Sequence, residues 1–275
     1  MAPILFYLGP LPVYGYGVML LAAFAAGIGM LRHELRRRAI DPRIAGSITL
    51  IAIVFGVLGS KALSLLDESR ASSLPAWLGA WRDTMTWYGG LLAAMAAIFL
   101  YLRLRGLPVA RIADAGAPAL MLAYGIGRVG CHLAGDGDYG RPTDLPWGVR
   151  YDAGLMPPSK AFAGIPELVA RFPAGLVPDD TPCHPTPLYE LALAVLICAA
   201  LLIWARRTPP DGSAFCLYLV LSSAARFVVE LLRLNPPGLF GLTEAQLISG
   251  ALALIGLAGS VYLRRRSVQP YLVSP

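Results

Sequence analysis

Long apolar runs with almost no charge constrain the fold of this chain more than any other feature. Several of them extend over about 18 residues or more, the length that a helix needs to cross a hydrocarbon core of about 30 Å. They are continuous and rich in Leu and Ala, so helices are predicted and strands are not. Charged residues make up 15% of the chain, below the roughly 25% of soluble domains. The sequence therefore predicts an all-α, multi-pass membrane protein.

Seven transmembrane helices are predicted from these runs. Their ranges are 13–31, 44–66, 87–102, 113–133, 187–205, 213–232 and 243–263. The third is short, and the fourth contains Pro118 and Arg128. Between the fourth and fifth helices, residues 134–185 are rich in proline and acidic side chains and are expected to form a small extracytoplasmic insert. The whole chain, 1–275, is expected to be one integral-membrane domain.

The distribution of arginine predicts how the chain is oriented. Every second connection is rich in arginine, whereas the connection after the second helix has only Arg70 and Arg82. Because short cytoplasmic loops carry an excess of Lys and Arg, the N-terminus is predicted outside and the C-terminus inside. This asymmetry explains most of the net charge of +6, so no nucleic-acid partner is expected.

A smaller group of charged residues falls within the predicted helices. Such residues are costly in a membrane and therefore mark functional candidates. Arg128 and Arg226 lie roughly 22 and 20 Å along helices that run outward, at 1.5 Å per residue. Arg226, Glu230 and Arg233 share one helix face, because their spacing is i, i+4, i+7. We expect a cavity with excess positive charge near the outer leaflet, suited to the phosphate of a phospholipid.

Simpler structural explanations exist for each of these charges. Lys61 and Arg233 could extend their side chains to the interface. Arg226 could form an ion pair with Glu230 that serves only the fold. For Arg128 this explanation is weaker because residues 125–141 are rich in glycine, which disfavours a straight helix. We expect Arg128 to lie on a broken helix end that faces the cavity, since irregular backbone at this depth must line a site.

Five motifs occur along the chain in a fixed order. They are YGYGVM at 14–19, WYGGL at 87–91, GRVGCHLAGDGDYG at 127–140, HPTPLYE at 184–190 and ARFVVELLR at 225–233, with Gln246 following. Together they resemble the motifs of bacterial prolipoprotein diacylglyceryl transferases, and the resemblance covers most of the chain. It implies a transferase of lipoprotein biosynthesis in the bacterial cytoplasmic (inner) membrane, with its active site facing the outer leaflet.

The resemblance implies a reaction and its partners. Diacylglyceryl would pass from phosphatidylglycerol to the lipobox cysteine thiol of a prolipoprotein, forming a thioether and releasing glycerol phosphate. The partners would be phosphatidylglycerol, the prolipoprotein lipobox peptide and the lipid bilayer, with the protein acting as a monomer. No cofactor and no metal is expected, although His132, Asp136, Asp138 and His184 could imitate a metal cluster.

The resemblance also assigns candidate site residues. The catalytic candidates are Arg128, Arg226, Tyr88, His184 and Glu190. The candidates for binding phosphatidylglycerol are Arg128, Arg226, Tyr16, Gly127, Gly130, Gly140, Glu230 and Arg233. The arginines would stabilise the leaving phosphate, and the two glutamates would orient the arginines.

Several positions depart from the family pattern and indicate a divergent member or a paralogue. Tyr88 stands where the family has histidine, and Cys131 and Ala134 stand where it has asparagine. Tyrosine is a poor base, with an ordinary pKa near 10, so His132 or His184 could activate the thiol instead. Transfer to a different acceptor, and a non-enzymatic phospholipid-binding protein, are the alternative functions. A disulfide between Cys131 and Cys183 is an alternative to two free thiols.

Overall fold

The computed structural model describes residues 1–67, 87–207, 209–235 and 238–268. Arg70 and Arg82, used above to predict the orientation, lie outside the described residues. The chain divides into two compact units, which are described separately: unit 1 comprises Met1–Met30 and Gly116–Pro275, and unit 2 comprises Leu31–Ala115. The prediction of a largely helical chain is confirmed.

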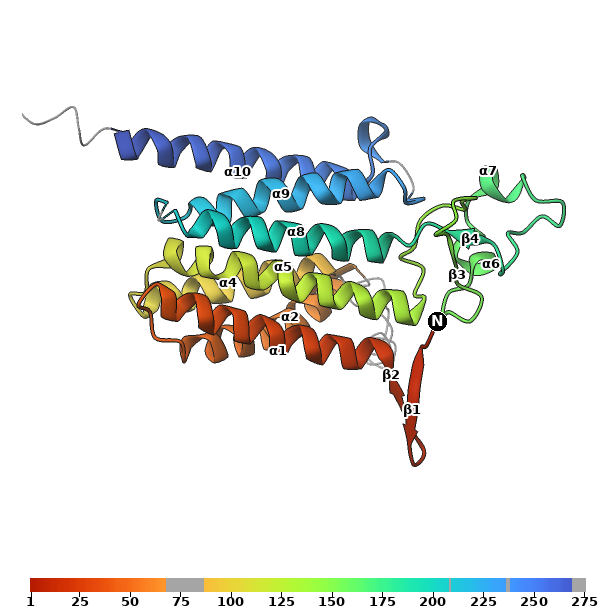
Figure 1. Ribbon diagram of the computed structural model, residues 1–275, viewed down its shortest axis with the longest axis horizontal. Helices are drawn as coiled ribbons and strands as arrows, with labels where there is room; N and C mark the ends of the chain where they lie inside the picture. Colours follow the sequence, from red (N-terminus) through yellow and green to blue (C-terminus); the bar gives the residue numbers. More distant parts are fainter. Residues whose placement is uncertain (68–86, 208, 236–237, 269–275) are drawn as a thin grey trace, which may run out of the picture. The chain divides into compact units, whose positions relative to one another are not determined.

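The apolar runs form helices close to the predicted ranges. They are α1 (Gly15–Arg37), α2 (Ile44–Asp67), α4 (Trp87–Leu104), α5 (Val109–Ala134), α8 (Thr186–Ala205), α9 (Ser213–Glu230) and α10 (Glu244–Val268) (Figure 1). Within the described part of the chain, six helices are long and apolar enough to cross a membrane, and the apolar helix Tyr88–Leu104 is shorter. The third predicted span is therefore confirmed as the short one.

The first helix continues six residues beyond its predicted end at residue 31. Its last turns contain Glu34, which is buried and pairs with Arg37 at 3.0 Å and also with Arg38. Pairs at i, i+3 and i, i+4 stabilise a helix, and arginine in the last turn also complements the helix dipole. Part of the arginine-rich connection is thus helical.

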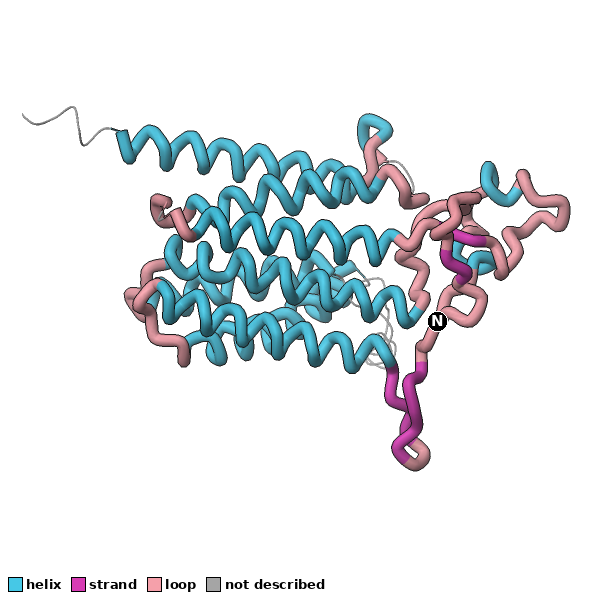
Figure 2. Tube along the Cα trace, viewed as in Figure 1, coloured by secondary structure: helices cyan, strands magenta, loops and turns pink. Residues whose placement is uncertain are grey.

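The start of unit 1 is a β-hairpin. Strand β1 (Ile4–Leu8) pairs with β2 (Leu11–Tyr14) through a turn at Gly9, whose φ of 61° suits glycine. The hairpin leads directly into α1 and extends away from the helices of unit 1 (Figure 2). Its side chains are apolar and largely exposed.

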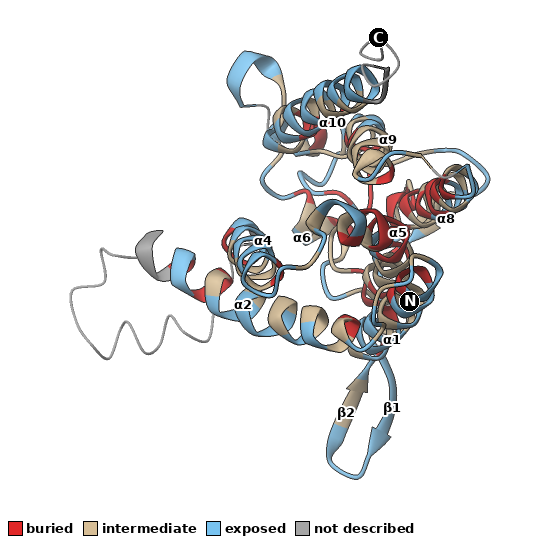
Figure 3. Cartoon of the chain, turned by 90° about the vertical axis from the view of Figure 1, so that its left-hand side faces the viewer, coloured by how far each residue is buried: buried red, intermediate tan, exposed pale blue. Residues whose placement is uncertain are grey.

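The core of unit 1 lies between α5, α8 and α9. Met121 of α5 packs with Ala194, Ile197 and Leu201 of α8, and partly buried side chains of α9 cover them. Figure 3 shows buried positions concentrated on α5 and α8. This packing places the end of α5 beside the start of α8.

Residues 135–185 fold over the end of unit 1 where α5 stops and α8 begins. They contain β3 (Val149–Arg150), α6 (Pro158–Ala161), α7 (Pro166–Val169) and β4 (Pro182–Cys183), and β3 pairs with β4. Tyr139 and Tyr151 stack with their ring centroids 4.1 Å apart, at the centre of a small apolar core.

Glycines allow α2 and α4 of unit 2 to approach closely. A Cβ atom on Gly59 would lie 2.5 Å from the carbonyl oxygen of Gly89, and one on Gly90 would lie 2.6 Å from that of Gly56. The glycines of the WYGGL motif therefore have a packing role.

Gly59→Ala is expected to lower the free energy of unfolding by about 1–3 kcal/mol, because the added methyl group overpacks this contact. The measurement is thermal unfolding in detergent. Gly46→Ala in the same helix is the control, since a Cβ there meets nothing within 4 Å. Equal unfolding temperatures for both variants would contradict this packing role.

Candidate active site

The predicted break before Arg128 is wrong, because α5 continues without interruption to Ala134. The glycines inside the helix serve packing: a Cβ on Gly125 would lie 3.0 Å from Ala194 of α8, and one on Gly130 would lie 3.4 Å from the Cα of Tyr16. Close packing against α8 and α1 outweighs the low helix propensity of glycine here. The chain leaves the helix at Gly135 and Gly137, whose φ angles are 59° and 91°.

Glu190 joins the two arginines that the sequence singled out. Its carboxylate lies 3.2 Å from Nε of Arg128 and 3.6 Å from Nη1 of Arg226, and Tyr124 donates a hydrogen bond of 2.7 Å to it. The Glu190 side chain is 2% exposed. A buried carboxylate that contacts two guanidinium groups fixes their positions relative to each other.

Glu230 holds Arg226 from the other side. Its carboxylate lies 2.8 Å from Nη2 of Arg226 and accepts hydrogen bonds from Asn235 at 2.6 Å and Thr243 at 2.9 Å. Thr243 and Gln246 also exchange hydrogen bonds at the start of α10. The Glu230 side chain is fully buried. Its hydrogen bond from Thr243 links α9 to the start of α10.

Asp138 bridges Arg128 and Arg233, with one carboxylate oxygen toward each arginine. Burial raises the pKa of Asp138, but the charges of Arg233 and Arg128 outweigh it and leave this pKa below its ordinary value. The carboxylate is therefore ionised at neutral pH. Arg233 is paired in the protein and does not simply extend to the interface.

The network differs in charge from the expected cavity. Three arginines, Arg128, Arg226 and Arg233, meet three carboxylates, those of Asp138, Glu190 and Glu230. Charges at membrane depth are stable only when they are paired, which explains this balance. The excess of positive charge that the sequence suggested is thus absent from this group of described residues.

The remaining predicted binding residues of unit 1 lie around the network. Tyr16 begins α1 against Gly130 of α5, and Gly127 has open space where a Cβ would be. Gly140 lies in a tight crossing: a Cβ there would be 2.7 Å from the carbonyl oxygen of Leu232. Its N–H donates to the carbonyl of His184 at 2.9 Å. Gly140 therefore ties the loop to the start of α8.

The two histidine candidates lie outside the arginine network. Nδ1 of His184 lies 3.3 Å from the hydroxyl of Tyr189. Nδ1 of His132 lies 3.1 Å from the hydroxyl of Tyr151. Burial and the charge of Arg141 lower the pKa of His184, so the ring is neutral at pH 7. Tyr88 is the second residue of α4 in unit 2, and its catalytic role stays a prediction.

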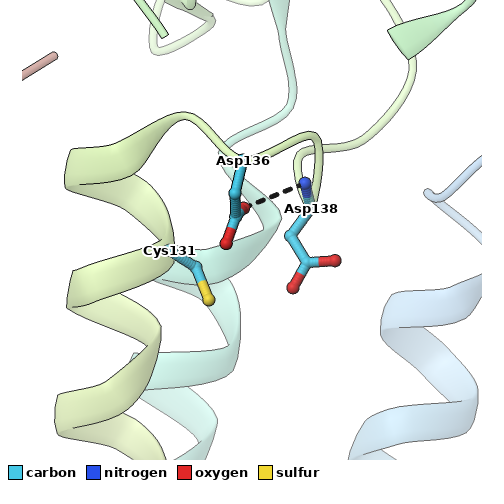
Figure 4. Close-up of side chains that lie close together, drawn as sticks. All are labelled: Cys131, Asp136 and Asp138. Atoms are coloured by element: carbon cyan, nitrogen blue, oxygen red, sulfur yellow. Dashed lines mark hydrogen bonds between the residues drawn. The ribbon is translucent and has the colours of Figure 1, made fainter. Parts of the chain in front are cut away.

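Cys131, Asp136 and Asp138 are the group of described residues with the spacing of metal ligands. Their ligand atoms lie within 4.8 Å of one another (Figure 4). The backbone N–H of Asp138 donates to Asp136 at 3.2 Å, and Arg128 donates to the Cys131 sulfur at 3.6 Å. The positive charge beside this group is thus supplied by the guanidinium of Arg128. The histidines of the cluster considered from the sequence are not part of the group.

The four cysteines are free thiols, including Cys131 and Cys183. Cys183 is buried in the core of the 135–185 segment, and burial raises its pKa to about 12. Because the thiolate is the reactive form, we expect the folded protein to leave Cys183 unmodified by N-ethylmaleimide at pH 8 and to react faster as the pH rises.

Mass spectrometry of the modified peptides measures this reactivity. Denatured protein without reductant should take up four labels, whereas a Cys131–Cys183 disulfide would limit it to two. Rapid labelling of Cys183 in the folded protein at pH 8 would contradict its protected position.

Four residues of the network are not among the site residues predicted from the sequence: Tyr124, Asp138, Asn235 and Thr243. Tyr124 precedes Arg128 by one helical turn, and its ring lies 5.0 Å from the Arg128 guanidinium. Because residues four apart lie on the same helix face, this spacing could have indicated that Tyr124 lies beside Arg128. Asp138 was noted only as part of an imitated metal cluster, and its pairing with Arg233 joins residues 95 positions apart.

The fold and this network define a multi-pass helical membrane protein with a buried ionic site at one end of unit 1. A model of the family described as prolipoprotein diacylglyceryl transferase matches residues 3–262. The chain therefore belongs to the prolipoprotein diacylglyceryl transferase family, whose activity is lipoprotein diacylglyceryl transfer. It is a transferase, as the five motifs predicted.

Curated relatives agree along nearly the whole chain, and each is named phosphatidylglycerol–prolipoprotein diacylglyceryl transferase. The one from Clostridium tetani is 29% identical over 94% of this chain and 96% of its own. The one from Symbiobacterium thermophilum is 31% identical over 97% and 94%, and the one from Chromohalobacter salexigens is 30% identical over the same shares.

Proposed function

We propose that this chain transfers diacylglyceryl from phosphatidylglycerol to the lipobox cysteine thiol of prolipoproteins. The thiolate attacks the glycerol carbon that bears the phosphate, the carbon–oxygen bond breaks, and glycerol phosphate leaves with the bonding electrons. The thiol proton passes to a base or to the departing phosphate. The reaction takes place at the outer leaflet of the bacterial cytoplasmic membrane, and the protein acts as a monomer.

The observation that carries this proposal is the ionic network of Arg128, Glu190 and Arg226. Negative charge grows on the phosphate as it leaves, and preorganised guanidinium groups stabilise that charge most in the transition state. Glu190 and Glu230 hold the arginines on rigid helices, which reduces the reorganisation needed during the reaction.

A thiol becomes a nucleophile only as its thiolate, so the site also needs a proton acceptor or a positive field. His184 is neutral at pH 7 and is the proposed base from unit 1, while the nearby arginines supply the field. Tyr88 of the WYGGL motif is a further proposed catalytic residue. Both roles rest on the motifs that contain these residues: His184 keeps the histidine of its motif, whereas Tyr88 stands where the family has histidine.

Incubation of the purified protein with phosphatidylglycerol and a lipobox peptide tests the proposal. Mass spectrometry should detect a diacylglyceryl adduct on the peptide cysteine, and glycerol phosphate should appear in equal amount. A peptide with serine in place of that cysteine is the control. No adduct on cysteine, with phospholipid consumed, would overturn the proposed acceptor.

A different acceptor is the second candidate function. The departures Cys131 and Ala134 favour it, because they replace amide side chains of the family motif beside Arg128. In the same assay, an adduct on an amine or hydroxyl peptide but not on the lipobox cysteine would support this alternative.

A further inference from the structure

The three carboxylates of the network are held very differently. Glu190 and Glu230 are on helices, are almost fully buried, and accept hydrogen bonds from neutral donors in addition to their ion pairs with arginine. Asp138 lies in the loop after α5, its side chain is 31% exposed, and the partners of its carboxylate are two arginines. Asp138 is therefore the carboxylate that can leave its partners at the lowest cost.

The bridge that Asp138 forms has the chemistry of a bound phosphodiester. One oxygen faces Arg128 and the other faces Arg233, so a single negative charge is shared between two guanidinium groups. The two non-bridging oxygens of a phospholipid phosphate carry the same charge and present the same two acceptors. The anion and Asp138 cannot both occupy these two donors.

We propose that Asp138 is a displaceable counter-ion that occupies the phosphate subsite of Arg128 and Arg233 until phosphatidylglycerol replaces it. The inference rests on the proposed function. It names the subsite and the residue that sets the strength of substrate binding. Asp138 is a positioning residue, since it acts on the substrate through the arginines.

The main chain around Asp138 is anchored, while its carboxylate is partly exposed. Thr186 of α8 donates a hydrogen bond of 2.6 Å to the backbone carbonyl of Asp138, and the backbone N–H of Asp138 donates to Asp136. A change of side-chain rotamer is thus enough to release the arginines. The exchange keeps both arginines paired with an anion before and after binding, which avoids the high cost of an unpaired buried charge.

Binding measured without an acceptor peptide tests this proposal. The probe is short-chain phosphatidylglycerol, titrated onto the detergent-solubilised full chain. In Asp138→Asn the competing charge is lost while the side-chain shape is kept, so we expect Kd to fall by about tenfold or more, because the competent state no longer requires displacement. Asp138→Glu keeps the competing charge and is expected to bind no more tightly than the unmodified protein.

Asp136→Asn is the matched control, since it removes the same charge two residues away; its Kd is expected to change less than twofold. Unchanged or weaker binding by Asp138→Asn would overturn the proposal, as would equal tightening by Asp136→Asn. Inorganic phosphate in place of the lipid should bind far more weakly and show the same ranking of variants. Phosphate that binds as tightly as the lipid would overturn the assignment to a lipid headgroup.

The transfer assay separates this proposal from the proposed function. Tighter binding by Asp138→Asn without any peptide adduct in the unmodified protein would reject the function and support the subsite. Peptide transfer without tighter lipid binding by Asp138→Asn would reject only the proposed role of Asp138. The absence of binding in every variant would reject both.

Discussion

Arg128→Ala is expected to reduce the rate of diacylglyceryl transfer by about 10²–10³-fold, the usual cost of removing one donor that stabilises transition-state charge. Arg128 contacts two carboxylates from separate elements, Glu190 on α8 and Asp138 in the loop. Its loss leaves Glu190 with Arg226 and Asp138 with Arg233. The fold should therefore survive, and the loss should fall on catalysis.

Two further variants make the Arg128 result specific. Arg128→Lys keeps the charge but not the planar fork, so we expect it to lose about tenfold or more in rate. Arg150→Ala removes an exposed arginine of the 135–185 segment and should transfer at the unmodified rate. Rates are measured with the lipobox peptide on protein whose unfolding temperature has been checked. Full activity in folded Arg128→Ala would contradict the phosphate role.

Glu190→Gln is expected to have the largest effect on stability. Glutamine keeps the shape of the side chain but leaves Arg128 and Arg226 without the carboxylate that they share. Removing one partner of a buried ion pair costs about 3–5 kcal/mol, since the remaining charge stays desolvated. The rate of transfer should also fall by about 10²-fold, because the two guanidinium groups lose the carboxylate that fixes their relative positions.

Tyr124→Phe is the matched control for Glu190→Gln. It removes one hydrogen bond to the same carboxylate and keeps both ion pairs, so its cost should stay near the 1.5–3 kcal/mol of a hydrogen bond to a charged group. Thermal unfolding in detergent compares the two variants. A Glu190→Gln protein that unfolds at the same temperature as Tyr124→Phe would show that Glu190 is not the centre of the network.

The helices and the family were predictable from the sequence, because both depend on local patterns. Apolar runs predict spans directly, and the error at the end of α1 arose because Glu34 pairs with Arg37 and Arg38 instead of ending the helix. The motifs that contain Arg128 and Arg226 also pointed to residues that the structure brings together. The sequence also predicts that Glu190, which contacts both arginines, orients them.

The remaining features of the site depend on contacts between distant positions. Tyr124 and Glu190 are 66 residues apart, and Asp138 and Arg233 are 95 apart. No local pattern indicates that the loop after α5 returns to the end of α9. The predicted break in the glycine-rich segment is wrong for the same reason, since the partners that favour a helix through Gly125 and Gly130 lie on α8 and α1. The pairing of three arginines with three carboxylates likewise depends on these contacts between distant positions.

A crystal structure of the protein grown in a lipid phase doped with phosphatidylglycerol tests the central claim most directly. We expect the headgroup phosphate within hydrogen-bonding distance of the Arg128 guanidinium, with Glu190 still holding Arg128 and Arg226 in place. A headgroup bound elsewhere, beside an unchanged ionic network in a protein that still transfers diacylglyceryl, would contradict it.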